Sequence, residues 1–149
     1  MTIDAVKECP YYLISRVSLV VTSALKKGFA AAGVEQVRPA YLCVLMNLWQ
    51  EDGLKVVELS RNAGLEPSTM TGLLDRMERD ELVARTADPN DRRVLRINLT
   101  KTGQQVRDPV LKVVDRVLTE VFAGIAEDDI SQTKNLLRHV IANAHEDST

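Results

Sequence analysis

The hydrophobic period changes abruptly between residues 67 and 100, and this change limits the folds open to the chain more than any other feature. Apolar residues first recur every three or four positions, at Met70, Leu73, Leu74 and Met77. That spacing is typical of one face of an amphipathic helix. Apolar and polar residues then alternate over 95–99, as they do along a strand. The segment is therefore predicted to be a short helix followed by a β-hairpin.

The other side of the predicted helix carries hydrogen-bonding groups with little to bury, which are Ser68, Thr69, Thr71, Asp75, Arg76 and Arg79. The hairpin tip, residues 88–91, has the turn-rich sequence Asp-Pro-Asn-Asp, and two arginines follow it. A polar-faced helix and a hairpin with a basic tip form the outline of a winged helix-turn-helix. This outline predicts DNA binding.

A second, smaller helix is predicted just before the first, from Glu58 to Ala63, after a short extended piece over 55–57. Gly64 follows it where a left-handed cap is needed, and Pro67 stands where a first helical turn tolerates proline. Two helices joined by a short turn containing Gly are typical of a helix-turn-helix. The alternative is an ordinary helical hairpin in a bundle, and the attached β-hairpin favours the DNA-binding interpretation.

The distribution of charge agrees with a basic hairpin. The chain has 149 residues, of which 45% are hydrophobic and 27% charged, and its formal net charge of −2 argues against a general polyanion binder. Residues 61–107 nevertheless carry nine cations against seven anions. Five of those cations lie without an anion within 92–107: Arg92, Arg93, Arg96, Lys101 and Arg107. The alternative is that this run is only a solvated face.

Several classes of protein are excluded by the sequence. No apolar run approaches the ~20 residues that cross a membrane, and the N-terminus lacks a signal pattern, so we expect a cytoplasmic protein with no membrane partner. Cys9 and Cys43 do not make a disulfide framework. His139 and His145 fall on different faces of one predicted helix, and no Gly-rich phosphate loop is present. We expect no enzymatic activity, no metal site and no cofactor.

Apolar helices precede the hairpin segment. Residues 5–32 are predicted as one long helix whose apolar face is wide enough for a core or a second subunit. Pro10 fits only near a helix start, so the first ordered turn is expected around Glu8 or Cys9. The next helix is predicted over 40–50, and its expected core face consists of Leu42, Leu45, Met46 and Trp49.

Two more helices are predicted after the hairpin. Thr100 can cap the first, whose apolar period continues to Ala123, with a kink or a later start at Pro109. Gly124 and the acidic residues 127–129 mark a turn and the start of the last helix.

These elements predict a mainly α fold with a small β-hairpin wing. The winged helix-turn-helix occupies residues 39–103 of a single domain, residues 1–149. The helices on either side, residues 5–34 and 104–147, can pack against each other and against a second copy of the chain. They are therefore predicted to form a helical dimerisation platform that carries two DNA-reading units.

The chain resembles the multiple-antibiotic-resistance regulator (MarR) family of bacterial winged-helix transcription factors. The wing fits the family pattern of Asp-x-Arg, five residues and Leu-Thr, with a Gly after it, at Asp91, Arg93, Leu99, Thr100 and Gly103. Residues 65–71 and 74–78 also match the recognition-helix region of the family. The resemblance is specific over residues 39–103 and elsewhere concerns only the order of the elements.

The resemblance implies a homodimer that binds double-stranded DNA at a palindromic operator, and most often a repressor released by a small aromatic effector. The residues that it assigns to DNA are Ser68, Thr69, Thr71, Arg76, Asp91, Arg92 and Arg93. Hydroxyl groups near a helix N-terminus suit phosphates and base edges. Arg93 would favour a narrow minor groove, with Asp91 holding its guanidinium. The alternative is that this pair only stabilises the hairpin.

Two departures from the family pattern are visible. Gly72 stands where members often carry Arg, so the helix has no side chain there to read a base. Asp80-Glu81 stands where many members have a basic residue and Gly, so Glu81 must enter a left-handed conformation or the helix must end differently.

The resemblance also implies an effector site, whose expected lining residues are Tyr11, Tyr12, Arg16, Arg38 and Trp49. Plain core packing is the alternative for these side chains. Some relatives sense oxidants through an N-terminal cysteine, and Cys9 lies about one turn before that position. Cys43 is expected to be a buried, inert thiol. A redox-responsive regulator using Cys9 or Cys43, and a helical interaction protein without DNA binding, are the alternative functions.

Overall fold

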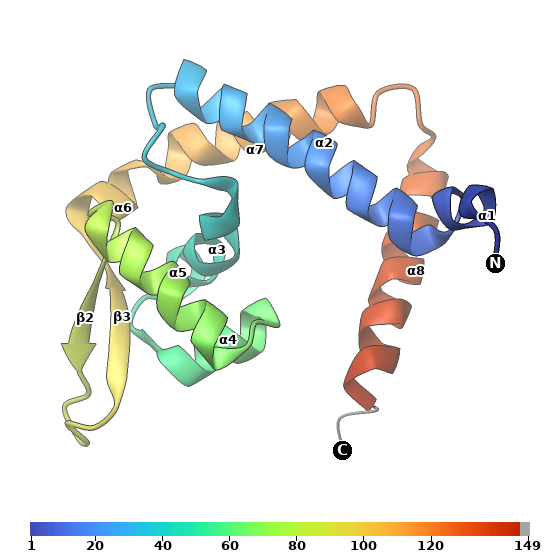
Figure 1. Ribbon diagram of the computed structural model, residues 1–149. Coiled ribbons are helices and arrows are strands. Elements are labelled where there is room, and N and C mark those ends of the chain that lie inside the picture. The colour runs from blue at the N-terminus through green and yellow to red at the C-terminus, as the bar shows by residue number, and fades with distance from the viewer. Residues whose placement is uncertain (147–149) are drawn as a thin grey trace. The chain divides into compact units, whose positions relative to one another are not determined.

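The computed structural model describes residues 1–146 as two compact units, which divide after Val117 (Figure 1). The helices are α1 (Ile3–Lys7), α2 (Pro10–Ala31), α3 (Leu42–Gln50), α4 (Val56–Ala63), α5 (Pro67–Arg79), α6 (Lys101–Gln105), α7 (Arg107–Val121) and α8 (Glu127–Glu146). The remaining elements are a 3-10 turn η1 (Pro39–Tyr41) and the strands β1 (Leu54–Lys55), β2 (Val83–Ala87) and β3 (Leu95–Leu99). This mainly helical fold with a small sheet confirms the predicted fold class. Residue 147, the last of the predicted platform, lies outside the described residues.

The core of the first unit is formed by apolar side chains from α2 through α7. The predicted stripe of α5 is part of it, because Met70, Leu73, Leu74 and Met77 are each 3% exposed or less. The largest fully buried side chains from other elements include Tyr41, Phe29, Leu45, Leu48 and Leu59. The amphipathic pattern therefore placed α5 correctly, with one face in the core.

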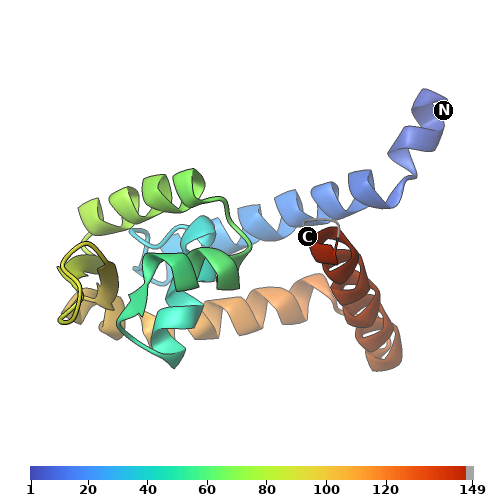
Figure 2. The same ribbon diagram turned by 90° about the horizontal axis from the view of Figure 1, so that it is seen from below.

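The sheet has the strand order β1-β3-β2, and both pairs are antiparallel. Val83 lies opposite Leu99 and Ala87 opposite Leu95, which confirms the predicted hairpin. Ile97 is fully buried, whereas Leu95 near the tip is 43% exposed. The hairpin follows directly from the end of α5 and lies at one edge of its unit in both views (Figures 1 and 2), so its tip leaves the core.

The long N-terminal helix predicted over 5–32 is divided in two, so that prediction was wrong in part. Pro10 is the first residue of α2, and Cys9 before it is extended, with ψ 149°. A residue before proline is pushed out of the helical region, and proline has no N–H to continue the previous helix. Residues 3–7 consequently form the separate helix α1.

The predicted core face of α3 was also partly wrong. Leu45 is buried as expected, but Met46 is 40% exposed, and Val44 and Leu48 are buried instead. Nearly every residue of this helix is apolar, so the periodicity could not select a face. The helix α4 begins two residues earlier than predicted, because the Glu58 carboxylate accepts the backbone N–H of Lys55 at 2.7 Å and caps the first turn there.

Of the two alternatives that the sequence left for the end of α5, the structure has the left-handed one, with Glu81 at φ 60°. The backbone N–H of Leu82 bonds to the carbonyl of Met77 at 3.0 Å, which closes the end of α5. The Glu81 carbonyl accepts the Thr100 hydroxyl at 2.6 Å. Thr100 also caps α6 by accepting the N–H of Gly103 at 3.0 Å, as predicted. The strained residue is thus held by the start of α6.

The second unit consists, within the described residues, of the end of α7, a turn and α8. Gly124 in the turn has φ 79°, and the first turn of α8 carries the acidic residues predicted there. A groove of about 570 Å³ lies within this unit, and most of its lining is apolar: Leu118, Thr119, Phe122, Ala123, Ile125, Ile130, Thr133, Lys134 and Leu137.

Candidate nucleic-acid interface

The turn between α4 and α5 has the geometry that the sequence predicted. Gly64 ends α4 in the left-handed conformation, with φ 66° and ψ 29°. Its N–H bonds to the Arg61 carbonyl at 3.3 Å, and the N–H of Leu65 bonds to the Ser60 carbonyl at 3.1 Å. These bonds satisfy carbonyls that the end of a helix leaves open. Pro67 then opens α5, which completes a helix-turn-helix.

The outward face of α5 is polar and accessible. Its predicted DNA-contacting residues are all exposed: Ser68, Thr69, Thr71 and Arg76. The Thr71 hydroxyl donates to the Pro67 carbonyl at 3.0 Å, which leaves its oxygen lone pairs outward. In the described part of the chain no ion pair engages Arg76, since its neighbour Asp75 pairs with Arg85 instead. This face therefore offers hydroxyl groups and the guanidinium of Arg76 to a partner, with Arg79 exposed at the end of the helix.

Gly72 lies on α5 beside Arg76. A Cβ atom at Gly72 would lie 3.8 Å from Nη1 of Arg76, which is ordinary van der Waals contact. The glycine is therefore not required by packing, and its absent side chain leaves room for the Arg76 guanidinium to fold back along the helix. Arg76 is the cation closest to the position where many family members carry an arginine.

The wing tip holds the predicted ion pair between Asp91 and Arg93. Nε and Nη2 of Arg93 donate to the two carboxylate oxygens at 3.1 and 3.3 Å, and the backbone N–H of Arg93 donates at 3.0 Å. These donors, the Arg93 side chain above all, lower the pKa of Asp91. The Arg93 side chain is 90% exposed, and Arg92 is exposed beside it. The pair fixes the guanidinium at the tip without covering it.

A second ion pair, which sequence reasoning missed, anchors the turn after β2 to β3 and to the loop before β1. Asp88 is only 5% exposed and accepts the backbone N–H groups of Asn90 and Asp91 at 2.8 and 3.2 Å. It also accepts Nε of Arg96 at 2.5 Å, and Nη1 of Arg96 donates to the Gly53 carbonyl at 2.8 Å. The Asn90 N–H and then the Arg96 guanidinium lower the pKa of Asp88. Arg96 is thus a structural cation and was wrongly counted with the free charges of the wing.

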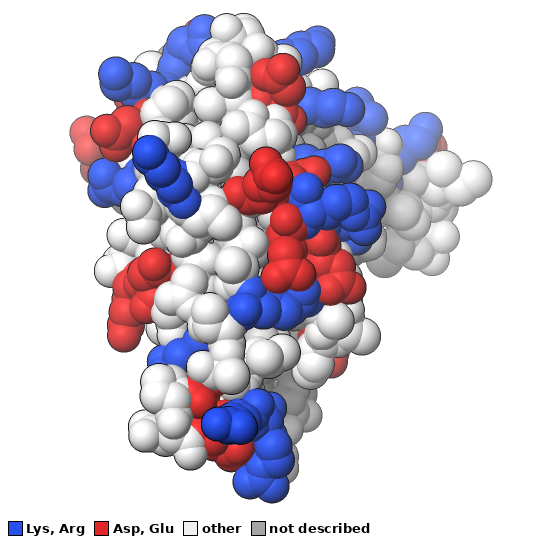
Figure 3. All heavy atoms as spheres, turned by 90° about the vertical axis from the view of Figure 1, so that its left-hand side faces the viewer, with Lys and Arg blue, Asp and Glu red and all other residues white. Residues whose placement is uncertain are grey.

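The sequence did contain a signal for this anchor. Asp88 stands two residues before Asn90, and an aspartate side chain often closes a turn by accepting the backbone N–H two residues further on. The partner Arg96 could not be found that way, because it lies across the hairpin, and neither could Gly53, which lies in the turn between α3 and β1. Figure 3 shows the resulting surface: Lys and Arg side chains gather at the lower end of this face, where the hairpin tip lies, with acidic side chains directly beside them.

The C-terminal end of α5 is tied to η1. The Tyr41 hydroxyl donates to Oδ2 of Asp80 at 2.6 Å, and Nε of Arg38 lies 3.5 Å from the same oxygen. Tyr41 is fully buried, and this burial together with the bond to Asp80 raises its pKa. Arg38, predicted at an effector site, thus forms an exposed ion pair with the end of the recognition helix.

The other predicted effector residues have separate surroundings in the protomer. Tyr11 is 80% exposed and Tyr12 is 37% exposed on the first turn of α2. Arg16 lines a shallow hollow along α2, and Trp49 donates its indole N–H to the Gly103 carbonyl at 2.9 Å. Their assignment to an effector stays a prediction.

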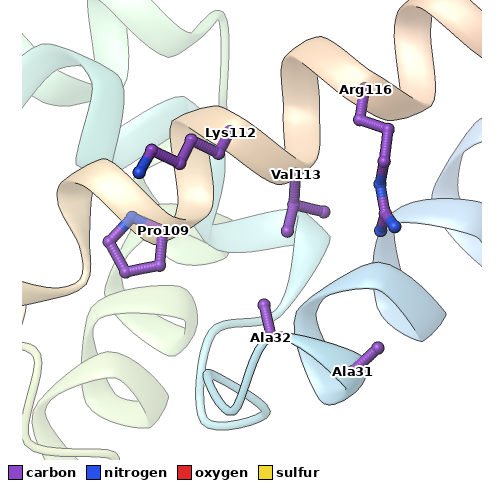
Figure 4. Close-up of a pocket in the computed structure, with 6 residues that line it drawn as sticks. All are labelled: Ala31, Ala32, Pro109, Lys112, Val113 and Arg116. Carbon is purple, nitrogen blue, oxygen red and sulfur yellow. The ribbon is translucent and has the colours of Figure 1, made fainter.

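A different hollow, of about 390 Å³, lies between the end of α2 and α7 (Figure 4). Ala31, Ala32, Pro109 and Val113 form its apolar part, and Lys112 and Arg116 flank Val113 one turn apart. A Cβ atom at Gly28 would lie 2.6 Å from Cγ1 of Val113, so glycine is needed for this close approach of α2 and α7. The hollow combines apolar surface with two cations, which suits a small organic anion.

The two cysteines lie in different surroundings. Sγ of Cys9 accepts the Tyr12 N–H at 3.4 Å and caps α2. Sγ of Cys43 donates to the Ala40 carbonyl at 3.3 Å, and burial raises the pKa of this thiol. A raised pKa disfavours the nucleophilic thiolate. Among the side chains that the structure describes, no three of His, Cys, Asp or Glu come together as a metal site, and none of the described helices is long and apolar enough to span a membrane.

A helix-turn-helix with an exposed polar second helix, followed by a hairpin with a basic tip, defines the winged helix-turn-helix class of DNA-binding proteins. Within that class, the family model described as "MarR family" matches residues 39–95. The transcriptional repressor MdtR of Bacillus subtilis is 31% identical over 111 residues, which cover 74% of this chain and 72% of MdtR. The chain belongs to the MarR family of transcriptional regulators.

Solved structures agree with this assignment. A MarR-family regulator from Rhodococcus sp. RHA1 is 31% identical, with a TM-score of 0.72 over 87% of this chain and 89% of its own. CouR from Rhodococcus jostii RHA1, solved with p-coumaroyl-CoA, is 27% identical, with a TM-score of 0.73 over 90% and 92% of the two chains. A structure of the repressor CouR on a 23-mer DNA duplex has a TM-score of 0.79 at 23% identity, over 95% and 98%.

Proposed function

We propose that this protein is a homodimeric repressor that binds a palindromic operator and is released from it by a small-molecule effector. The observation that carries DNA binding is the outward face of α5, whose polar residues are exposed while its apolar stripe is buried. Repression is supported by the likeness to MdtR and CouR, which are repressors. The protein is proposed to act in the cytoplasm and to have no catalytic activity.

Two sets of residues are proposed to contact DNA. The first lies on α5 and would meet the major groove and its phosphates: Ser68, Thr69, Thr71 and Arg76. The second lies at the wing tip and would meet the minor groove: Asp91, Arg92 and Arg93. Asp91 acts in this scheme by holding the guanidinium of Arg93, so that the cation reaches DNA in one conformation.

Dimerisation through residues 5–34 and 104–147 is supported by apolar side chains that the protomer leaves exposed. On α2 they include Leu13, Val17 and Val20, which are 47, 51 and 53% exposed. On α8 they include Leu136, Val140 and Ile141, which are 66, 58 and 58% exposed. A soluble chain gains free energy by covering such stripes with a second copy. The operator is then expected to have half-sites about 10 base pairs apart.

An aromatic acid or its thioester is the proposed effector class, supported by the likeness to CouR, whose structure holds p-coumaroyl-CoA. Tyr11, Tyr12, Arg16, Arg38 and Trp49 are the proposed lining residues. The hollow of Figure 4 is a second candidate, because Lys112 and Arg116 would attract a carboxylate. A thermal-shift screen of aromatic carboxylates on the wild type, Arg16→Ala and Arg116→Ala tests which place binds the effector.

The DNA-binding proposal is tested with duplexes selected by the protein from a random pool. Binding of the wild type, Arg93→Ala and the control Lys26→Ala is measured against salt concentration. We predict that Arg93→Ala weakens binding at least about fivefold and reduces the salt slope by about 0.9 for each wing. Lys26→Ala removes one exposed charge from α2 and should leave both quantities near the wild-type values. Operator binding of Arg93→Ala as tight as that of the wild type would contradict the wing assignment.

The redox-responsive alternative receives less support, since burial raises the pKa of the Cys43 thiol. It is tested with the double variant Cys9→Ser, Cys43→Ser. Retained DNA binding under peroxide in this variant, with loss of binding in the wild type, would establish a cysteine switch. Equal loss in both proteins would exclude one.

A further inference from the structure

Arg85, on strand β2, makes several polar contacts to the recognition helix α5, whereas the hydrogen bonds of Arg93 and Arg96 go to other elements. Nη2 donates to Asp75 at 2.6 Å, and Nη1 donates to Glu78 at 3.0 Å. Nη2 also lies 3.4 Å from the Thr71 carbonyl. The Arg85 side chain is only 21% exposed, whereas Asp75 and Glu78 are 54 and 44% exposed. The guanidinium is therefore enclosed by α5, not presented to solvent.

Glu78 binds the backbone of Arg85 as well as its side chain. The second carboxylate oxygen of Glu78 accepts the backbone N–H of Arg85 at 3.2 Å. Because β2 is an edge strand, this N–H faces away from β3 and would otherwise have no partner in the sheet. Asp75 and Glu78 are three residues apart and share one face of α5. One arginine thus joins two turns of the recognition helix to the middle of the wing strand.

Arg85 differs from the cations at the wing tip in its number of carboxylate partners and in its exposure. Arg93 has one carboxylate partner and is 90% exposed, whereas Arg85 has two carboxylate partners and is mostly covered. Two carboxylates and one guanidinium leave the cluster net negative. A phosphate would be repelled by the acidic groups and would have to break a charge-assisted pair to reach the guanidinium.

We propose that Arg85 is a positioning residue for DNA recognition, which sets the angle between α5 and the wing through Asp75 and Glu78 without contacting DNA itself. The inference rests on the proposed function. A protein that inserts a helix into one groove and a wing tip into another must hold the two at a fixed spacing. Within residues 67–95, Arg85 makes the only polar contacts that join α5 to β2 and the hairpin tip.

A competing role is visible in the structure. Arg85 lines a hollow of about 360 Å³ between α5 and the wing, together with Thr71, Lys55 and Arg93. A DNA phosphate seated there would make Arg85 a direct contact. The two roles predict opposite changes in DNA affinity when the carboxylates of Asp75 and Glu78 are removed. If Arg85 contacts a phosphate, its guanidinium is freed and binding becomes tighter. If Arg85 positions the wing, the wing is released from α5 and binding becomes weaker.

The test compares Arg85→Met, Arg85→Lys and the double variant Asp75→Asn, Glu78→Gln with the wild type. The probes are a duplex that the wild type selects from a random pool and a random-sequence duplex. For Arg85→Met we expect affinity for the selected duplex to fall about tenfold, with the salt slope and the affinity for random duplex nearly unchanged. The double variant is expected to weaken selected binding as well. Arg85→Lys keeps the positive charge but cannot donate to both carboxylates as the planar guanidinium does, so it should lose less affinity than Arg85→Met.

Two results would overturn the proposal. One is a salt slope that falls by about 0.9 for each Arg85 removed, which marks a phosphate contact. The other is tighter DNA binding by the Asp75→Asn, Glu78→Gln variant. Circular dichroism and melting of each variant report whether it folds, and the double variant keeps the test valid if Arg85→Met does not. If the wild type selects no duplex at all, the proposed function fails, whereas unchanged binding by Arg85→Met contradicts only the role of Arg85.

Discussion

Gly103 is the position where the structure predicts the largest effect of a single methyl group. A Cβ atom there would lie 2.1 Å from the carbonyl oxygen of Leu82 and 3.1 Å from its carbonyl carbon. Ordinary contact begins at 3.4 Å, so α6 or the start of β2 must move by more than one ångström. The obstacle is backbone, which cannot rotate away as a side chain can. Gly103→Ala must therefore displace the element itself.

The cost follows from what that displacement disturbs. The Leu82 carbonyl accepts the Thr100 N–H at 3.1 Å, and the Gly103 carbonyl accepts the Trp49 indole at 2.9 Å. Overpacking costs about 1–3 kcal/mol, and weakening two hydrogen bonds adds about 1 kcal/mol each. Alanine returns about 1 kcal/mol of helix propensity. The expected net loss is about 2–4 kcal/mol, a lowering of Tm by roughly 5–15 °C for a chain of this length.

Gly72→Ala is the matched control, because it makes the same substitution in another helix. Its Cβ atom would have no neighbour closer than 3.8 Å, so only the helix propensity changes. We expect a gain of about 1 kcal/mol and a rise in Tm of roughly 2–4 °C. Both variants are compared with the wild type by thermal and urea unfolding at one protein concentration, since the proposed dimerisation would make Tm depend on concentration. If Gly103→Ala melted within about 2 °C of the wild type, the argument from close approach would be refuted.

Two further predictions concern the wing and the end of α5. The pKa of Asp88 is lowered in the folded state by the Asn90 N–H and the Arg96 guanidinium, so its stabilising contribution is present above its ordinary pKa and is lost as pH falls through the lower folded value. Asp88→Asn should therefore be less stable than the wild type at neutral pH, and urea unfolding at decreasing pH should find the difference shrinking below pH ~4; a constant difference would contradict the ion-pair explanation. Glu81→Gly relieves the positive φ of 60° and should raise the free energy of unfolding by about 1 kcal/mol, with Arg79→Gly, at an ordinary helical φ in the last turn of α5, as a destabilised control; a loss of stability in Glu81→Gly would show that φ is not the source of strain.

Local signals in the sequence were enough to predict most elements of the winged helix-turn-helix. The stripe of α5, the left-handed cap at Gly64, the cap at Thr100 and the pair of Asp91 with Arg93 were all predicted, because each depends on residues within a few positions of one another. Proline at position 10 predicted the start of α2 to within one or two residues, at Glu8 or Cys9, although not that a separate helix would precede it. These features follow from backbone geometry and short-range hydrogen bonds, which do not depend on how distant parts of the chain pack.

Tertiary structure alone decided the features that join elements distant in the chain. The buried face of α3 was chosen by what packs around it, since its sequence is apolar on several sides. Gly103 matched a family pattern, but only the carbonyl of Leu82 beside it explains why a side chain cannot stand there. The anchors made by Arg96 and Arg85 reach residues from 7 to 43 positions away, and their acidic partners looked like ordinary surface charges. A contact between distant residues is set by how the chain folds back on itself, and hydrophobic period and turn chemistry do not encode that distance.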